Sequence, residues 1–110
     1  MRYYAAHRIW LTGHEEMLSM CRVGVDADHH VVSVEPFEGE PRQTEWLGGI
    51  IIVSPVLPGR EADEGFSRFC DRLRTSIGSC TSMGTIYAFH VSPFRVREME
   101  FAPESRFRRL

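Results

Sequence analysis

The stretch "TEWLGGIIIVSPVLPGREADEGF", Thr44 to Phe66, decides the fold of this chain. Trp46 to Val53 is a mostly apolar run whose length suits a buried β-strand. Ser54-Pro55 and Pro58-Gly59 follow it, and both residue pairs are typical of a chain that turns after a strand. We therefore expect a buried strand here, and the chain beyond it should show what that strand supports.

A covering helix is predicted after this strand, over about residues 61–77. Apolar residues recur there three and four positions apart, which is the spacing of one helical face. This apolar stripe consists of Phe66, Phe69, Cys70, Leu73 and Ile77. Gly78 suits the end of the helix. Because a short amphipathic helix is not stable alone, we expect it to pack on a β-sheet.

Strands are predicted on both sides of this region. Residues 3–11 alternate with a period of two, which indicates one strand. Residues 21–36 have the pattern of a hairpin, in which alternating valines flank the turn "DADH" at 26–29. Residues 84–91 predict a further strand, which Pro93 interrupts. In "RVREMEF", a candidate last strand, the alternation slips between Val96 and Met99, which indicates a bulge or a turn.

Together these elements predict a mainly β fold. We expect a small antiparallel β-sandwich or half-open barrel of five to seven strands with one covering α-helix. A length of 110 residues fits a single domain, residues 1–110, with the helix inserted between strands. A hydrophobic content of 43% is enough for a real core.

Charge and cysteine content limit the classes of partner. The net charge of -2 gives no global preference for nucleic acid or for an anionic membrane, so neither is expected as a partner. No apolar run approaches the roughly 20 residues of a membrane span, and the first ten residues lack the apolar core of a signal peptide. The three cysteines have no metal-ligand spacing and an odd number, so we expect free thiols in the cytoplasm.

The candidate catalytic residues are Cys80, His90 and His7. A cysteine nucleophile needs a histidine near it in space, and Cys80 follows Gly78 in a predicted loop, where it is the cysteine most open to solvent. His7 and His90 lie in predicted strands and would meet if those strands pair. The competing interpretation, which we favour, is that both are partly buried histidines satisfied by neighbouring hydrogen bonds. Cys70, on the apolar stripe, is expected in the core.

Two charged clusters have a functional and a structural interpretation. His29 and His30 stand beside Asp26 and Asp28, which is a candidate metal cluster, but a solvated turn explains the same residues. The C-terminal "SRFRRL" could follow phosphates, but a solvated tail, or arginines paired with nearby acids, explains it better. We prefer the structural interpretation in both cases, and predict no metal and no cofactor.

Three segments carry a resemblance to a known family. "AAHRIWLTG", "VGVDADHHVVSVEPF" and "TEWLGGIIIVSP" resemble the N-terminal segment of metal-dependent amidohydrolases, whose first strands build a small β-sandwich beside a catalytic barrel. "HVSPFRVREMEFAPESRFRRL" is similar to the strands with which such chains return to that sandwich. The resemblance implies that the first and last strands share a sheet. In that family the apolar strand leads through a "PGF-v-D-x-H-x-H" motif to the first two metal ligands.

This chain departs from the family at the metal motif. Its corresponding segment is "SPVLPGREADEGF", and no histidine occurs between His30 and His90. Two imidazoles two residues apart on a strand can bind one metal, whereas one remote histidine cannot. The catalytic barrel, about 250 residues, has no counterpart in 110 residues.

We therefore expect a non-catalytic module that acts by self-association, as a homo-oligomer, or by binding a protein partner. Aromatic side chains left exposed together on its strands would mark the contact surface. The alternative is a small enzyme or ligand-binding domain that uses Cys80, His90 and His7.

Overall fold

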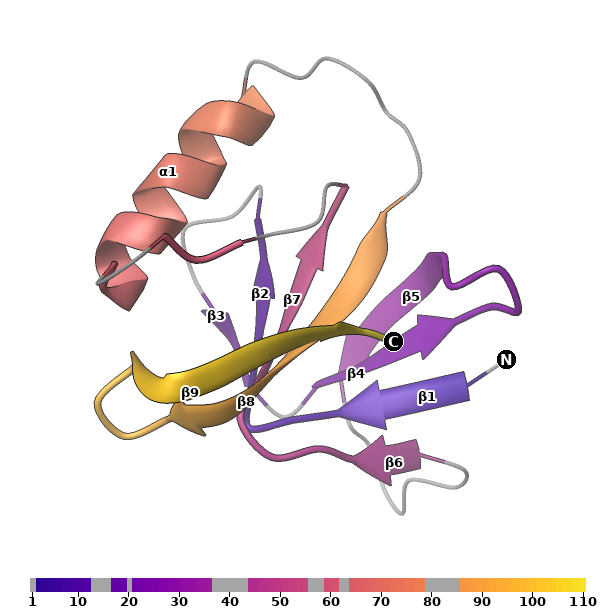
Figure 1. Cartoon of the computed structure of the whole chain (residues 1–110). Coiled ribbons are helices and arrows are strands. Elements are labelled where there is room, and N and C mark those ends of the chain that lie inside the picture. The colour runs from indigo at the N-terminus through magenta and orange to yellow at the C-terminus, as the bar shows by residue number, and fades with distance from the viewer. Residues whose placement is uncertain are drawn as a thin grey trace.

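This computed structural model describes residues 2–12, 17–19, 21–36, 44–55, 59–61, 64–78 and 86–110, with the backbone alone for 76–78. These residues form nine strands and one helix (Figure 1). One sheet has the order β5-β4-β1-β6, with β1 (Arg2–Ala5), β4 (Cys21–Val25), β5 (Val31–Pro36) and β6 (Thr44–Trp46). The other has the order β3-β2-β7-β8-β9, with β2 (Arg8–Leu11), β3 (Met17–Leu18), β7 (Ile50–Ser54), β8 (Tyr87–Arg95) and β9 (Glu100–Arg109). With the single helix α1 (Phe66–Gly78), this confirms the predicted fold class.

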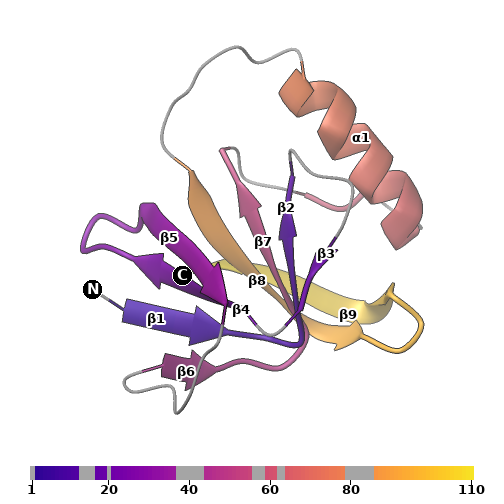
Figure 2. The ribbon, with the colours of Figure 1, turned by 180° about the vertical axis from the view of Figure 1, so that it is seen from behind.

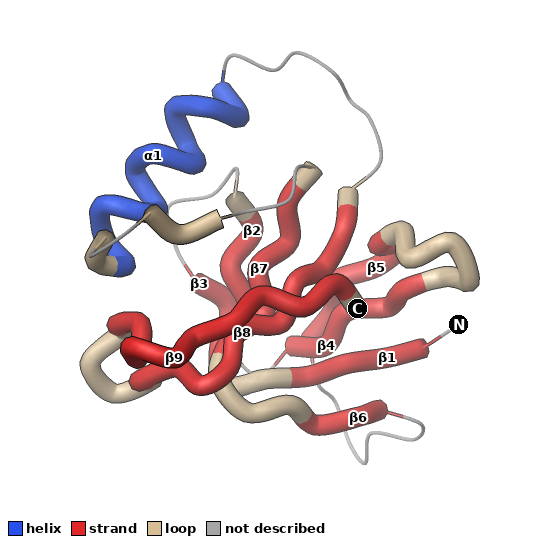
Figure 3. Tube along the Cα trace, in the orientation of Figure 1, coloured by secondary structure: helices blue, strands red, loops and turns tan. Residues whose placement is uncertain are grey.

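Two chain segments pass from one sheet to the other. The segment predicted as one strand over residues 3–11 bends after Ala5, so β1 lies in the first sheet and β2 in the second (Figure 3). β6 and β7 are related in the same way, and they run parallel to β1 and β2. The bend also breaks the predicted alternation. In one continuous strand Tyr4 and Ile9, five residues apart, would lie on opposite faces, but both face the core between the sheets. Bent strands are one reason that the described residues form more than the expected five to seven strands.

Gly49 makes the bend between β6 and β7 possible. Its φ angle of 81° lies in the left-handed region, which a side chain disfavours. A Cβ atom built at this position would collide with the main-chain oxygen of Val91 on β8. The second glycine of "LGGIII" is therefore required by both the backbone conformation and the close approach of β8.

β7 is buried on both faces, which explains its continuous apolar sequence. Ile51 and Val53 belong to the core between the two sheets. Ile50 and Ile52 belong to a second core, which lies between the five-stranded sheet and α1. The five-stranded sheet is thus the middle layer of the molecule, with the helix on one side and the four-stranded sheet on the other (Figure 2).

Helix α1 begins later than predicted. It starts at Phe66 and not near residue 61, and it ends at Gly78 as expected. Phe66, Phe69, Cys70 and Leu73 are buried, so the described part of the apolar stripe is confirmed; the side chain of Ile77 lies outside the described residues. No helix in the described part of the chain is long and apolar enough to cross a membrane.

The C-terminal part of the chain differs most from the predictions. Pro93 does not end the strand: β8 continues through a cis Ser92-Pro93 bond, and its register with β9 shifts there. The slip at residues 96–99 is a turn, which is one of the two predicted alternatives. "SRFRRL" is no solvated tail, because Arg106 to Arg109 pair with β8 as part of β9. β1 and β9 lie in different sheets, so the expectation that the first and last strands share one is wrong.

Candidate functional site

His7 and His90 lie on either side of the segment that joins β6 to β7. His7 is exposed at the bend after β1, and its ring meets Trp46 edge-on with 5.2 Å between ring centroids. His90, on β8, is half-buried, and its Nε2 atom bonds to the main-chain oxygen of Gly48. Cys80 lies outside the described residues. No hydrogen bond or ring contact joins His7 to His90 within the described chain, so the predicted catalytic group is not assembled there.

The two described cysteines are core residues. Cys21 and Cys70 are buried free thiols. Burial raises the pKa of Cys21, and it raises the pKa of Cys70 to about 12. Both thiols are therefore protonated at neutral pH, and neither is a nucleophile. The expectation that Cys70 belongs to the core is confirmed.

The cluster at residues 26–30 is a turn that satisfies itself. One oxygen of Asp26 accepts the main-chain N–H groups of Asp28 and His30, at 2.9 and 3.0 Å, and the His30 bond is the main cause of the lowered pKa of Asp26. The His30 ring packs edge-on against Tyr87, and His29 Nδ1 lies 3.0 Å from the main-chain oxygen of Leu110. Among the described residues, no group of three or more His, Cys, Asp or Glu could hold a metal ion.

The outer face of the four-stranded sheet carries the most exposed aromatic residue of the described chain. Tyr4 points into the core, so alternation turns its neighbours Tyr3 and Ala5 to the outer face, where Tyr3 is partly exposed and Ala5 is covered. Trp46 pairs with Ala5 across β1 and β6, and it therefore lies on the same outer face. Its side chain is 49% exposed, whereas Trp10, in the core under the helix, is 0% exposed. The helix lies away from this sheet (Figures 1 and 2).

A charged pair crosses the same outer face. The Arg22 guanidinium on β4 lies 4.2 Å from the ring centroid of Tyr3 on β1. It also bonds to Glu35 on β5, with its nearest nitrogen at 2.7 Å. Stacking on an aromatic ring and pairing with a carboxylate hold the guanidinium flat against the sheet. The outer face thus presents one positive and one negative group beside Tyr3, His7 and Trp46.

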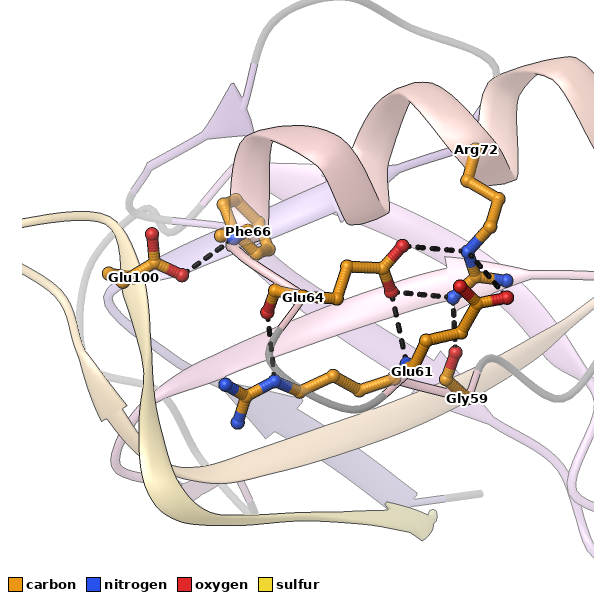
Figure 4. Close-up of polar contacts among 7 residues, drawn as sticks. Gly59, Glu61, Glu64, Phe66, Arg72 and Glu100 are labelled. Atoms are coloured by element: carbon orange, nitrogen blue, oxygen red, sulfur yellow. Dashed lines mark hydrogen bonds and ion pairs between the residues drawn. The ribbon is translucent and has the colours of Figure 1, made fainter.

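A second polar cluster anchors the start of the helix (Figure 4). Glu64 is only 4% exposed, and its carboxylate accepts hydrogen bonds from Arg72 at 2.7 and 2.8 Å and from the main-chain N–H of Glu61 at 3.1 Å. The Arg72 bonds lower the pKa of Glu64 from 4.5 to about 2. Arg60 donates to the main-chain oxygens of Glu64 and Ala102, at 2.9 and 3.1 Å, which ties this segment to β9. Because the carboxylate of Glu64 is bonded on both oxygens, we assign the cluster to structure.

Sequence reasoning missed this anchor. The predicted helix over about residues 61–77 includes Glu64, whereas the helix begins two residues later, at Phe66. Glu64 and Arg72 are eight residues apart and meet only because the chain turns back before Phe66. The sequence has no local signal for that contact.

Comparisons with models of protein families, with curated proteins and with solved structures find no match to this chain. Its function is therefore inferred from the residues on its own surface.

Proposed function

We propose that this chain is a non-catalytic binding module that self-associates through the outer face of its four-stranded sheet. The observation that carries the proposal is the exposure of Trp46, at 49%, beside His7 and Tyr3. Tryptophan is highly buried on average, and exposed aromatic residues that gather on one face are typical of protein interfaces. The face is built on strands, which hold its side chains in a regular array.

A second copy is the occupant that the charges favour. Arg22 and Glu35 carry opposite charges on the same face, so a two-fold axis can bring each arginine against the glutamate of the other copy. The net charge of -2 produces little repulsion between copies. An interface of this kind would cover Trp46, which otherwise leaves a large apolar surface in water.

The resemblance to amidohydrolases remains part of the proposal: the chain would be a relative of their sandwich domain without the catalytic barrel. The hairpin of β4 and β5 and the buried β7 support it, because these are the elements that carry the resemblance. The different sheets of β1 and β9 count against it. The alternative, a small enzyme or ligand-binding domain that uses Cys80, His90 and His7, is supported by no contact among the described residues.

Sedimentation equilibrium of matched variants tests the proposal. Trp46→Ser is expected to weaken self-association at least about tenfold, because a buried tryptophan typically dominates an interface. Ile86→Ser is the control, since Ile86 is also an exposed large apolar residue, at 37%, and it lies outside the four-stranded sheet, just before β8. Circular dichroism would confirm that both variants are folded. Equal weakening in the two variants, or no association of the wild type, would overturn the proposal.

A further inference from the structure

A cavity of about 550 Å³ lies at the end of the sandwich where the tip of the β4–β5 hairpin meets the end of β9. Arg2 of β1, Glu45 of β6, and Asp26 and His29 of the hairpin tip contribute to its lining. Arg108 and Arg109 of β9 complete the set of charged groups. The volume is typical of sites for small molecules.

The cavity gathers more positive than negative groups. Three arginines face two acids, and one of these acids, Asp26, already accepts two main-chain N–H groups within its turn. Within the described residues, no hydrogen bond or ion pair engages the side chains of Arg2, Arg108 or Glu45. The strands that carry Arg2 and Arg108 lie in different sheets, so the two guanidiniums converge only because the sandwich brings the ends of both sheets together.

Two neighbours hold the cavity wall in place. The guanidinium of Arg109 lies 5.7 Å from the ring centroid of Tyr87, which limits its freedom. His29 Nδ1 is engaged by the main-chain oxygen of Leu110, which ties the hairpin tip to the end of β9. A ligand would therefore meet a partly ordered set of donors.

We infer that this cavity binds a small anion that carries phosphate or carboxylate groups. A guanidinium presents only donors, in a planar fork that matches the oxygens of either group. This site is separate from the outer face at Trp46, and the inference does not depend on self-association.

Isothermal titration calorimetry distinguishes phosphate binding from carboxylate binding, with pyrophosphate as the probe for the first and citrate as the probe for the second. The wild type is expected to bind at least one probe, and Arg108→Gln to bind it about tenfold more weakly, since a charge-assisted hydrogen bond is lost. Arg106→Gln is the matched control: it removes the same charge from the same exposed strand, outside the cavity lining. This variant should bind within twofold of the wild type.

Glu45→Gln provides the second variant. Removal of this acid should strengthen anion binding two- to threefold, because one repulsive charge leaves the cavity. The inference is overturned if neither probe binds the wild type at millimolar concentration, if Arg106→Gln weakens binding as much as Arg108→Gln, or if Glu45→Gln abolishes binding. Unchanged thermal unfolding midpoints would show that each variant is folded.

Discussion

Gly48 and Gly49 are neighbours in sequence but differ in what their positions require. Gly49 has a φ of 81° and lies against the main chain of β8, whereas nothing lies within 4 Å of a Cβ built at Gly48. A local pattern of two glycines cannot tell which of them the bend needs. The difference comes from β8, about forty residues further along the chain.

Gly49→Ala should destabilise the fold by about 2–4 kcal/mol, since the added methyl group meets backbone and the φ angle disfavours a side chain. Urea unfolding, followed by circular dichroism, measures the change. Gly48→Ala is the control and should change the free energy of unfolding by less than about 1 kcal/mol. A Gly49→Ala variant as stable as Gly48→Ala would show that the bend is wrongly described.

Glu64 should make stability fall at acid pH. Its pKa is lowered from 4.5 to about 2 in the folded state, chiefly by Arg72. The unfolded chain binds the proton near pH 4.5 and the folded chain only near pH 2, so this contribution is complete above pH 4.5 and is lost as the pH falls to about 2. Glu64→Gln should destabilise the protein by about 2 kcal/mol at pH 7.

The measurement is urea unfolding of wild type and Glu64→Gln at several values between pH 7 and pH 2. The gap between the two proteins should narrow through this window. A gap that stays constant from pH 5 to pH 2 would contradict the assignment of the lowered pKa to Glu64.

Cys21 and Cys70 should resist alkylation in the native protein. Both are buried and have raised pKa values, so the reactive thiolate is scarce and covered. Mass spectrometry after treatment with iodoacetamide near pH 7.5 should find these two cysteines unmodified, and both modified once urea is added. Rapid native modification of Cys70 would contradict the packing of the helix on the sheet.

At the scale of elements, the start of α1 depends on a residue from another strand. Glu100, the first residue of β9, accepts the main-chain N–H of Phe66 at 2.6 Å (Figure 4). It also accepts the main-chain N–H of Phe101 at 2.9 Å. The first N–H groups of a helix have no partner within the helix, and a carboxylate there also interacts favourably with its dipole. Glu100 therefore joins the covering helix to the edge of the middle sheet.

Glu100→Ala should lower stability by about 1–2 kcal/mol, the effect expected for loss of a helix cap. Glu98→Ala, in the exposed turn before β9, is the control and should be nearly neutral. Hydrogen exchange should also show faster exchange of the first turn of α1 in Glu100→Ala alone. Equal stability of the two variants would remove the proposed link between helix and strand.

Elements with a local pattern could be predicted from the sequence. The hairpin of β4 and β5, the buried β7 and the apolar stripe of α1 all depend on residues close together in the chain, and their periods are visible. The bends after β1 and β6, and the helix start at Phe66, depend on contacts with distant strands. The candidate last strand, residues 95–101, overlaps β9 only at Glu100 and Phe101. The end of β9 was interpreted as a tail because its residues are polar and charged, although its partner β8 defines it as a strand.

The candidate sites, too, could be predicted only where they depend on residues close together in the chain. The strand pattern alone allows the inference that exposed aromatic residues would mark a binding face. It does not show which residue is exposed, because Trp10 and Trp46 lie in similar apolar runs. Their difference arises from the layers: α1 covers Trp10, and the outer face of the four-stranded sheet carries Trp46. The arginine-lined cavity joins residues 2 and 108, which no sequence spacing connects.

At the scale of the whole molecule, the five-stranded sheet is covered on both faces, while the four-stranded sheet has one face in the core. Among the described elements of the two sheets, the outer face of the four-stranded sheet is therefore left for a partner, and Trp46 lies on this face. We propose that a second copy covers this surface.

Acrylamide quenching of tryptophan fluorescence at increasing protein concentration tests whether a second copy covers Trp46. The chain has two tryptophans, and only Trp46 is exposed to the quencher, since Trp10 is fully buried. If a second copy covers Trp46, the quenching constant should fall as concentration rises, and the mass in solution should grow from one chain of 12.7 kDa to two. A quenching constant that stays the same at every concentration, with the mass of a single chain, would contradict it.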